Sequence, residues 1–426
     1  MSAEVISLHA RQPLLAGYLR VGHRGHRRLD HMLAAGKLQY KRFVFDASHL
    51  ADQTDLLRSL KKTGCEIVLD PNFSEMFFEG KFGTSVTRLP WANHDRPWTV
   101  DDFRAARNFD VARSIAEFSV KHGINAIIAP SHVIDLASVE SVSVDYSLCE
   151  SLRKELDRMG GSDIHIDFQL NLTAKTLADI SARQRLLSGL GSLPIDNVWL
   201  RVENFGANST GVATKNFIES ARHFHAHEKP VVVDYAGGLV GLSVLSFGAA
   251  GGLCHGIGMK EKFDISSWKK TGGRGGGTFI YVADLDRYLK PNQLSCFFEA
   301  KGSKSKFGCN DRDCCKQLQD MFDHHDEHFI VQRSKQLSEL AKIPVERRAD
   351  NFLLNLVGNT VRTARAASAL KVNDPTLQKS LLENKKRLQR FEEALVNLNN
   401  TASGSSNSRV PAFRGGTSSI SAVLAG

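Results

Sequence analysis

The feature that most constrains the fold is a regular alternation, from residue 42 onward, of short β-prone runs with stretches of helical period. Runs rich in β-branched and aromatic residues indicate strands, and the stretches between them indicate crossover helices. The runs lie at residues 42–48, 66–72, 125–130, 164–171, 197–206, 230–237, 252–258 and 278–285. Helices are predicted at residues 52–63, 100–122, 147–159, 174–190, 214–227 and 239–249. Eight strands with crossover helices predict a closed (β/α)8 TIM barrel, since an open sheet would place a GxGxxG turn after its first strand.

The segments outside this alternation set the expected domain boundaries. Residues 1–40 are predicted to be an N-terminal helical segment, and residues 41–345 the barrel, with an insertion at residues 286–328 after its eighth strand. Residues 346–400 have helical periodicity and are predicted to form C-terminal helices. Residues 401–426 are rich in Ser and Gly, which predicts a disordered tail.

The net charge and the cysteine content limit the expected cellular compartment and the expected class of binding partner. The formal net charge of +9 favours an anionic partner such as nucleic acid, although a merely basic protein would give the same value. The most apolar stretch, residues 238–253, is shorter than the roughly 20 residues that span a bilayer, so no membrane partner is expected. The odd number of seven cysteines and an N-terminus without a secretory apolar core indicate a cytoplasmic protein. A homodimer is compatible with the sequence.

Polar side chains close nearly every predicted strand, where barrel enzymes carry their chemistry. The candidate catalytic residues are Asp70, Asp167, Glu203, Asp234 and His255. The candidate substrate-binding residues on the strands are Asp46, Gln169, Asn171 and Arg201. Because side chains alternate along a strand, Asp167, Gln169 and Asn171 share one face, and that face is expected to line the lumen. The alternative for any single acid is a helix cap.

Glycines cluster after the sixth and seventh predicted strands. Gly238, Gly251 and Gly252 lack a Cβ and so permit a ligand to approach the backbone closely. Together with the TGGRGGG run at residues 271–277 they predict a phosphate cradle, because barrel phosphate sites often use the loops after strands seven and eight. Tight helix packing would explain the same glycines.

The insertion at residues 286–328 carries a cluster of cysteines and histidines. Cys309, Cys314 and Cys315 lie within seven positions, and three histidines follow closely, at positions 324, 325 and 328. Three thiolates and one imidazole would complete a four-coordinate structural Zn²⁺ site, which would stabilise an insertion with little core of its own. The alternative is a set of unliganded thiols on a solvated loop.

These features together resemble the tRNA-guanine transglycosylase family, including its relatives in 7-deazaguanine modification of DNA. The family joins a (β/α)8 barrel to a Cys3His zinc subdomain after the last strand, and Cys309, Cys314, Cys315 and His328 match that place. The resemblance also implies that the turn Gly237, Gly238 and Leu239 contacts the base through its backbone. It implies nucleic acid, tRNA or DNA, as the partner and a structural zinc ion.

The family's nucleophile is an Asp that closes the seventh strand, and this chain has Cys254 and His255 there. Glycosidic chemistry requires a carboxylate, so Asp70, Asp167, Glu203 and Asp234 are the candidates. The resemblance therefore implies a base-exchanging glycosyltransferase that acts on a purine base in nucleic acid, as in queuosine or 7-deazaguanine modification. The alternatives are a non-catalytic nucleic-acid-binding component of a modification or defence system, and a barrel enzyme for a phosphorylated small molecule.

Overall fold

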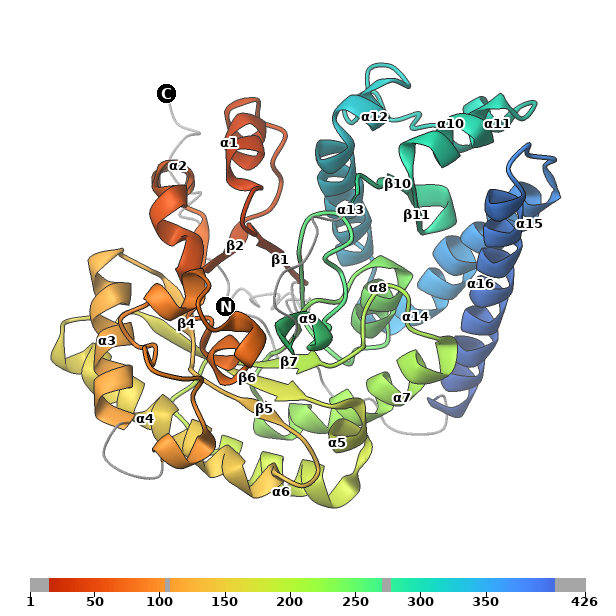
Figure 1. The fold of residues 1–426 in the computed structure, drawn as a ribbon. Helices are drawn as coiled ribbons and strands as arrows, with labels where there is room; N and C mark the ends of the chain where they lie inside the picture. Colours follow the sequence, from red (N-terminus) through yellow and green to blue (C-terminus); the bar gives the residue numbers. More distant parts are fainter. Residues whose placement is uncertain (1–14, 104–107, 270–276, 403–426) are drawn as a thin grey trace, which may run out of the picture.

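A computed structural model describes residues 15–103, 108–269 and 277–402 of the chain. Its main sheet has the strands β1 (Ala16–Arg20), β2 (Arg42–Asp46), β3 (Glu66–Asp70), β4 (Ala126–Ile128), β5 (Val133–Ile134), β6 (His165–Leu172), β7 (Asn197–Val202), β8 (Val231–Val233) and β9 (Gly252–His255). All pairings are parallel, and the β4–β6 pairing closes eight strands into a barrel, with the two-residue β5 beside β6. Helices surround the strands (Figure 1). The predicted (β/α)8 barrel is confirmed.

Two members of the ring differ from the sequence prediction. The first barrel strand is β1, which pairs with β2 and β9, and it lies in the segment that we expected to be helical. The run at residues 278–285 is not a barrel strand. Part of it forms β10 (Ile280–Val282), which pairs antiparallel with β11 (Arg287–Leu289) in a separate sheet. β9 is therefore the eighth strand.

Seven connections of the barrel carry helices close to the predicted ones. They are α1 (His26–Ala34), α2 (Thr54–Lys62), α3 (Asn108–Lys121), α4 (Val142–Arg158), α5 (Ala174–Ala178) with α6 (Ile180–Leu190), α7 (Gly211–Ala221) and α8 (Gly238–Ser246). The eighth is α13 (His325–Ala341), because its Phe329 packs on His255 of β9 and its Leu337 lies against Gly17 of β1. The insertion thus interrupts the connection from β9 to α13, at the carboxyl end of the strands.

The insertion is a small module on the barrel. We call it the Cys3His module: β10, β11, α10 (Pro291–Glu299), α11 (Ser303–Phe307), α12 (Asp320–Asp323) and the loop between α11 and α12. A buried ion pair ties it to the barrel, since Arg333 of α13 contacts Glu261 at 2.9 Å and Tyr288 of β11 donates to the same carboxylate. Arg333 and Glu261 are almost fully buried, so this link is part of the core.

The chain ends in a helical extension, as predicted. It contains α14 (Val345–Asn351), a π-helical stretch (Phe352–Val357), α15 (Gly358–Ala369) and α16 (Pro375–Ala402). α16 lies along α7 at the edge of the barrel (Figure 1). Gly211 permits this contact, because a Cβ there would lie 2.6 Å from the Arg390 carbonyl oxygen. Within the described residues no helix has the length and apolar character to cross a membrane. The predicted tail lies outside the described residues beyond position 402.

Candidate active site and metal centre

The barrel lumen is layered, and its polar layer lies at the carboxyl ends of the strands. Deeper in the lumen, small and aromatic side chains pack together: Ala16, Tyr18, Val44, Val68, Ala126, Ile128, Trp199, Val232 and Cys254. On β6 the alternate residues Phe168 and Leu170 join the larger core between strands and helices, which turns Gln169 and Asn171 to the lumen. The predicted common face of the β6 polar residues is thus a lumen face.

A network of two arginines and three aspartates fills the mouth of the barrel. Arg20 of β1 holds both oxygens of Asp234, with Nε 2.9 Å from Oδ1 and Nη2 2.7 Å from Oδ2. Arg20 also contacts Asp46 at 3.2 Å and Asp70 at 2.9 Å. Arg201 of β7 donates to Asp234 at 2.9 Å and to Asp70 at 2.8 Å. Residues from five barrel strands or strand ends therefore meet in one charge network.

Asp234 is the most heavily bonded member. Besides the two guanidinium groups, it accepts from the Gln169 side chain at 2.9 Å and from the Tyr235 backbone N–H at 2.9 Å. Burial opposes ionisation, but Arg20 and Arg201 outweigh it and hold the pKa of Asp234 well below its usual range. With both oxygens occupied, Asp234 is an ionised group that positions the two arginines.

Asp46 and Asp70 are neighbours whose pKa values move in opposite directions. They are register partners on β2 and β3. Burial raises the pKa of Asp46 to about 6, against the opposing effect of Arg20. At Asp70 burial acts in the same sense, but Arg20 and Arg201 prevail and lower the pKa. Three carboxylates face two guanidinium groups, so protonation of Asp46 makes the network neutral, and the Asp46 side chain keeps 19% exposure to solvent.

An aromatic cluster covers this network. Tyr235 stands over both arginines, with its ring centroid 4.7 Å from the Arg20 guanidinium carbon and 5.2 Å from that of Arg201. Phe263 and Trp268 pack beside it, and Phe78 adds to the same cluster. Tyr235 has a φ of 54°, a left-handed conformation that is uncommon for a residue of this size. Such strain is typical of residues that a functional site holds in place.

Asn171 leaves one buried acceptor at the mouth. Its side-chain nitrogen donates to the hydroxyl groups of Ser74 at 2.8 Å and Ser131 at 2.9 Å. Its Oδ1 atom is buried and has no hydrogen-bond partner within the described residues. Because a buried unpaired acceptor costs about 1–3 kcal/mol, this oxygen is suited to receive a donor from a ligand.

Three predicted catalytic residues lie outside the network. Asp167 shares the lumen face but lies deeper, where it accepts from Asn197 at 2.6 Å and from the Trp199 indole at 3.0 Å. Glu203 lies just beyond the end of β7, half-buried, and does not join the network. His255 belongs to the outer face of β9.

The surroundings of His255 give it a structural role. Its Nε2 atom lies 2.7 Å from the Tyr40 hydroxyl and its Nδ1 atom lies 2.8 Å from the Gly256 carbonyl oxygen. Burial lowers its pKa to about 3, so the ring is neutral near neutral pH. Alternation places Cys254 in the lumen instead, where its thiol is hydrogen-bonded to Asp234. Burial raises the pKa of this thiol well above the usual range.

The turn Gly237, Gly238 and Leu239 begins α8, and carboxylates already occupy its backbone donors. The Gly238 N–H donates to Glu261 and the Leu239 N–H to Asp286, both at 3.3 Å. A Cβ on Gly237 would lie 1.9 Å from the Glu261 carboxylate, so glycine is required for this contact. The other half of the expected phosphate cradle, residues 271–277, lies almost wholly outside the described residues.

The predicted metal ligands come together. The ligand atoms of Cys309, Cys314, Cys315 and His328 all lie within 4.8 Å of one another. His328 Nδ1 is 3.3 Å from the Cys314 sulfur and 3.4 Å from the Cys315 sulfur. His328 Nε2–H donates to the Tyr281 carbonyl oxygen at 3.0 Å, which orients the ring with Nδ1 directed at the sulfurs. This donor set could hold a metal ion, and His328 rather than its neighbours completes it.

Sequence reasoning missed two members of the mouth, Arg20 and Tyr235. The sequence predicts a helical segment at Arg20, because the run AGYLR is short for a strand and contains Gly and Arg. The β-prone Tyr18 before Arg20 and the Val-Gly that follows it are the sequence features that favour a strand here. Tyr235 directly follows the predicted Asp234, but a left-handed φ at a tyrosine has no sequence pattern.

Comparison with known proteins finds only distant structural likenesses. No protein-family model and no curated protein match this chain. Among solved structures, an endo-1,4-β-xylanase from Penicillium canescens matches with 9% identity and a TM-score of 0.39, covering 57% of this chain and 83% of the xylanase. A GH26 β-mannanase from Bacteroides ovatus matches with 14% identity and a TM-score of 0.36, covering 62% of this chain and 86% of the mannanase. A type I 3-dehydroquinate dehydratase from Clostridium difficile matches with 6% identity and a TM-score of 0.35, covering 61% of this chain and 90% of the dehydratase. Likenesses this distant carry no argument about activity.

Proposed function

We propose that this protein is a base-exchanging glycosyltransferase that acts on a purine base in tRNA or DNA. The observation that carries the proposal is the Asp46–Asp70 pair, two adjacent carboxyl groups whose pKa values are moved apart. One carboxyl whose pKa is raised to about 6, beside one whose pKa is lowered so that it stays ionised, is suited to the acid and the anion of glycosidic chemistry.

Each carboxyl has a role that fits its environment. The ionised Asp70 stabilises or traps the positive charge that develops at C1′ of the sugar when the glycosidic bond breaks. The departing base takes the bonding electron pair, and Asp46 gives it a proton. In the return step Asp46, now a carboxylate, accepts a proton from the incoming base. Asp234 is assigned a positioning role, because its side chain is fully buried within the network, whereas that of Asp70 retains 8% exposure to solvent.

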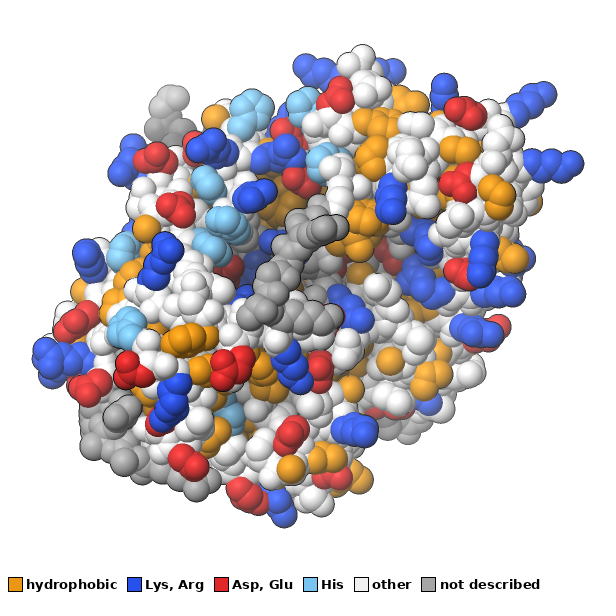
Figure 2. All heavy atoms as spheres, in the orientation of Figure 1, with side chains coloured by type: hydrophobic (Ala, Val, Ile, Leu, Met, Phe, Trp, Pro, Cys, Tyr) orange, Lys and Arg blue, Asp and Glu red, His pale blue; other side chains and the backbone are white. Residues whose placement is uncertain are grey.

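The groups around the acids supply recognition for a planar base. The Tyr235 ring and its aromatic neighbours offer a stacking surface above the charged layer. The unpaired Oδ1 atom of Asn171 offers an acceptor for an N–H group on the edge of a base. Lys and Arg side chains are spread over the face shown in Figure 2, mixed with acidic side chains, and the net charge of +9 favours a polyanionic substrate.

We further propose that the Cys3His cluster binds structural Zn²⁺. A tetrahedral site with Zn–S bonds of about 2.3 Å and Zn–N bonds of about 2.0 Å needs S···S separations of about 3.8 Å and S···N separations of about 3.5 Å. The sulfurs of Cys314 and Cys315 are 3.8 Å apart, and they lie 3.3 and 3.4 Å from His328 Nδ1. These distances fit that geometry. Four protein ligands leave no open position, so the ion would stabilise the module and take no part in catalysis.

The direct test is incorporation of radiolabelled guanine into bulk tRNA and into DNA by the purified protein. We expect incorporation by the wild type and at least a hundredfold loss for Asp70→Asn, because removing a group that acts in the transition state costs on the order of 10²–10⁴ in rate. Glu203→Gln is the matched control, since Glu203 lies outside the network, and it should retain wild-type incorporation.

Two results would overturn the assignment. Equal incorporation by Asp70→Asn and the wild type would remove Asp70 from the chemistry. Salt-sensitive binding of tRNA or DNA by the wild type, without incorporation or release of any base, would instead identify a non-catalytic nucleic-acid-binding protein.

A further inference from the structure

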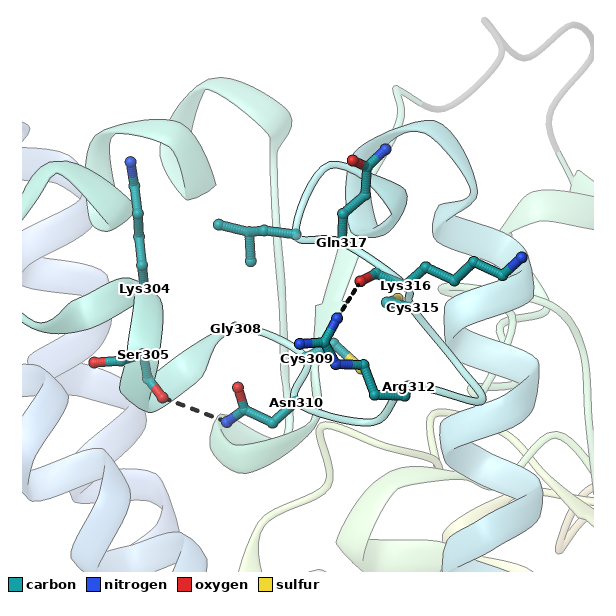
Figure 3. A pocket seen from close by; sticks show the side chains of 10 residues that line it. Lys304, Ser305, Gly308, Cys309, Asn310, Arg312, Cys315, Lys316 and Gln317 are labelled. Carbon is teal, nitrogen blue, oxygen red and sulfur yellow. Dashed lines mark hydrogen bonds between the residues drawn. The ribbon is translucent and has the colours of Figure 1, made fainter.

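The Cys3His module contains a pocket that the proposed reaction does not use. It has a volume of about 360 Å³ and lies between α11 and the loop that carries the cysteines (Figure 3). Its walls are formed by Lys304, Ser305, Gly308, Cys309, Asn310, Arg312, Cys315, Lys316, Gln317 and Leu318. The size is that of a small-ligand site.

Apart from the two cysteines of the metal cluster, Cys309 and Cys315, the charged side chains that line this pocket are all cationic. Three of its residues are Lys or Arg, and none is Asp or Glu. A second pocket on the other side of the cysteine cluster is the opposite, because Asp284 and Asp311 line it and no Lys or Arg does. The positive charge is therefore a property of the first pocket and not of the whole module.

Arg312 is held in position for a ligand. Its Nη1 atom donates to the Lys316 carbonyl oxygen at 2.8 Å, which fixes the guanidinium across the loop. Figure 3 shows the guanidinium in the space between the loop and α11, with Lys304 extending along the opposite wall. The Lys316 ammonium points away from that space (Figure 3). The guanidinium keeps further N–H donors, and a preorganised fork of this kind is suited to phosphate oxygens.

Neutral donors complete the lining. Asn310 and Ser305 lie at the base of the pocket and are joined by a hydrogen bond from the Asn310 amide nitrogen to the Ser305 carbonyl oxygen at 3.3 Å. Gln317 stands at the upper rim (Figure 3). A pocket with an arginine and a lysine on its walls, amide groups beside them and no carboxylate in its lining is suited to an oxyanion.

We propose that this pocket binds a phosphate group, with Arg312 and Lys304 as its principal ligands. The phosphate could come from a polynucleotide backbone or from a free phosphate or mononucleotide, since both present the same oxygens. The pocket lies apart from the barrel mouth, so phosphate binding here does not depend on base exchange by Asp46 and Asp70.

The test compares the full-length metal-loaded protein with the double variant Arg312→Gln/Lys304→Gln. The probes are a short single-stranded oligonucleotide, measured by fluorescence anisotropy across a salt series, and inorganic phosphate and AMP, measured by calorimetry. For a backbone phosphate we expect oligonucleotide affinity to fall about tenfold or more and the slope of log affinity against log salt to fall by about 2, one unit for each cation. For a free phosphate we expect loss of phosphate and AMP binding with oligonucleotide affinity unchanged.

The matched control removes the same charge elsewhere. Lys62→Gln/Lys154→Gln changes two exposed lysines on α2 and α4, and it should retain wild-type binding of every probe. Metal content is measured for each protein. If the pocket variant binds all probes like the control, the proposal is wrong. It is equally wrong if the variant loses metal while its phosphate binding is unchanged, because the cations would then only balance the thiolates.

Discussion

The barrel mouth and the Cys3His module are two polar sites on one chain, and they are stabilised in different ways. In the mouth, two guanidinium groups and three carboxyl groups at strand ends pair with one another at distances of 2.7 to 3.2 Å. In the module, four ligand atoms converge on one point from a loop and a helix. The charged groups of the mouth pair with one another, whereas the three cysteine sulfurs and the imidazole of the module form a donor set that could hold a metal ion.

The difference extends to the surrounding core. The mouth rests on a packed lumen layer and a closed sheet. The module has only short helices and the two three-residue strands β10 and β11. A site on the barrel can therefore serve catalysis through preorganised charge, while a site in the module must first stabilise its own fold.

Removal of the proposed metal ion should produce the largest loss of stability, and that loss should be confined to the Cys3His module. Metal binding at sites of this kind contributes about 10–16 kcal/mol at pH 7, so chelation should unfold the module and leave the barrel folded. We expect rapid proteolysis within residues 286–328 and little change elsewhere, measured by limited proteolysis with mass spectrometry. Cys309→Ser should behave like the chelated protein, and Cys296→Ser, outside the cluster, like the untreated one. Protection of the module after chelation would contradict this distinction.

Asp234→Asn should show that charge pairing is what stabilises the mouth. Removing one partner leaves two buried guanidinium groups short of a counter-charge, which should cost about 3–5 kcal/mol in the free energy of unfolding, measured in urea. The pKa of Asp234 lies below its unfolded value, so its contribution is present above the unfolded pKa and is lost as pH falls through the folded pKa. The difference between variant and wild type should therefore shrink in acid. Asp163→Asn, at an exposed position, should change stability by less than about 0.5 kcal/mol.

The contribution of Asp46 to the stability of the fold should change with pH in the direction opposite to that of Asp234. Its folded pKa of about 6 is raised, so between the unfolded pKa and about 6 the unfolded chain ionises first and stability falls as pH rises. The loss over that range should amount to at most about 3 kcal/mol. Asp46→Asn should abolish this loss, measured by thermal unfolding across the range. If base exchange uses the protonated acid, the wild-type rate should also decline above about pH 6. An identical stability profile for the variant would show that Asp46 titrates normally.

Substitution of Tyr235 should have the smallest effect on stability, and it tests how much the aromatic cluster stabilises the charge network. Tyr235→Leu removes the ring that stands over two buried guanidinium groups and should lower the free energy of unfolding by about 1–2 kcal/mol. Tyr235→Phe retains the ring and should remain within about 0.5 kcal/mol of the wild type. Chemical denaturation measures both. Equal losses in the two variants would assign the effect to the hydroxyl group.

The barrel and the metal ligands could be predicted from short-range pattern. Alternation along β6 placed Gln169 and Asn171 on one face, and the close spacing of Cys309, Cys314 and Cys315 indicated a metal-binding loop. Both inferences depend on neighbours within a single element or loop, where local geometry is nearly independent of the rest of the chain. The same reasoning misplaced His255, because the shift of one residue along β9 exchanges the lumen face for the outer face.

The sequence by itself determined the strand and helix periodicity, the position of the insertion before α13, and the three cysteines of the Cys3His cluster, whereas the structure selected His328 as their partner. Only the tertiary structure decided that β1 closes the ring in place of residues 278–285, and that Arg20 and Arg201 join Asp70 and Asp234. Barrel closure and charge pairing join residues far apart in the chain, such as Arg20 and Asp234, 214 positions apart. Burial raises the pKa of Asp46, while the distant charges of Arg20 and Arg201 lower that of Asp70, and so the acid and the anion of the mouth could be assigned only once the strands were in place.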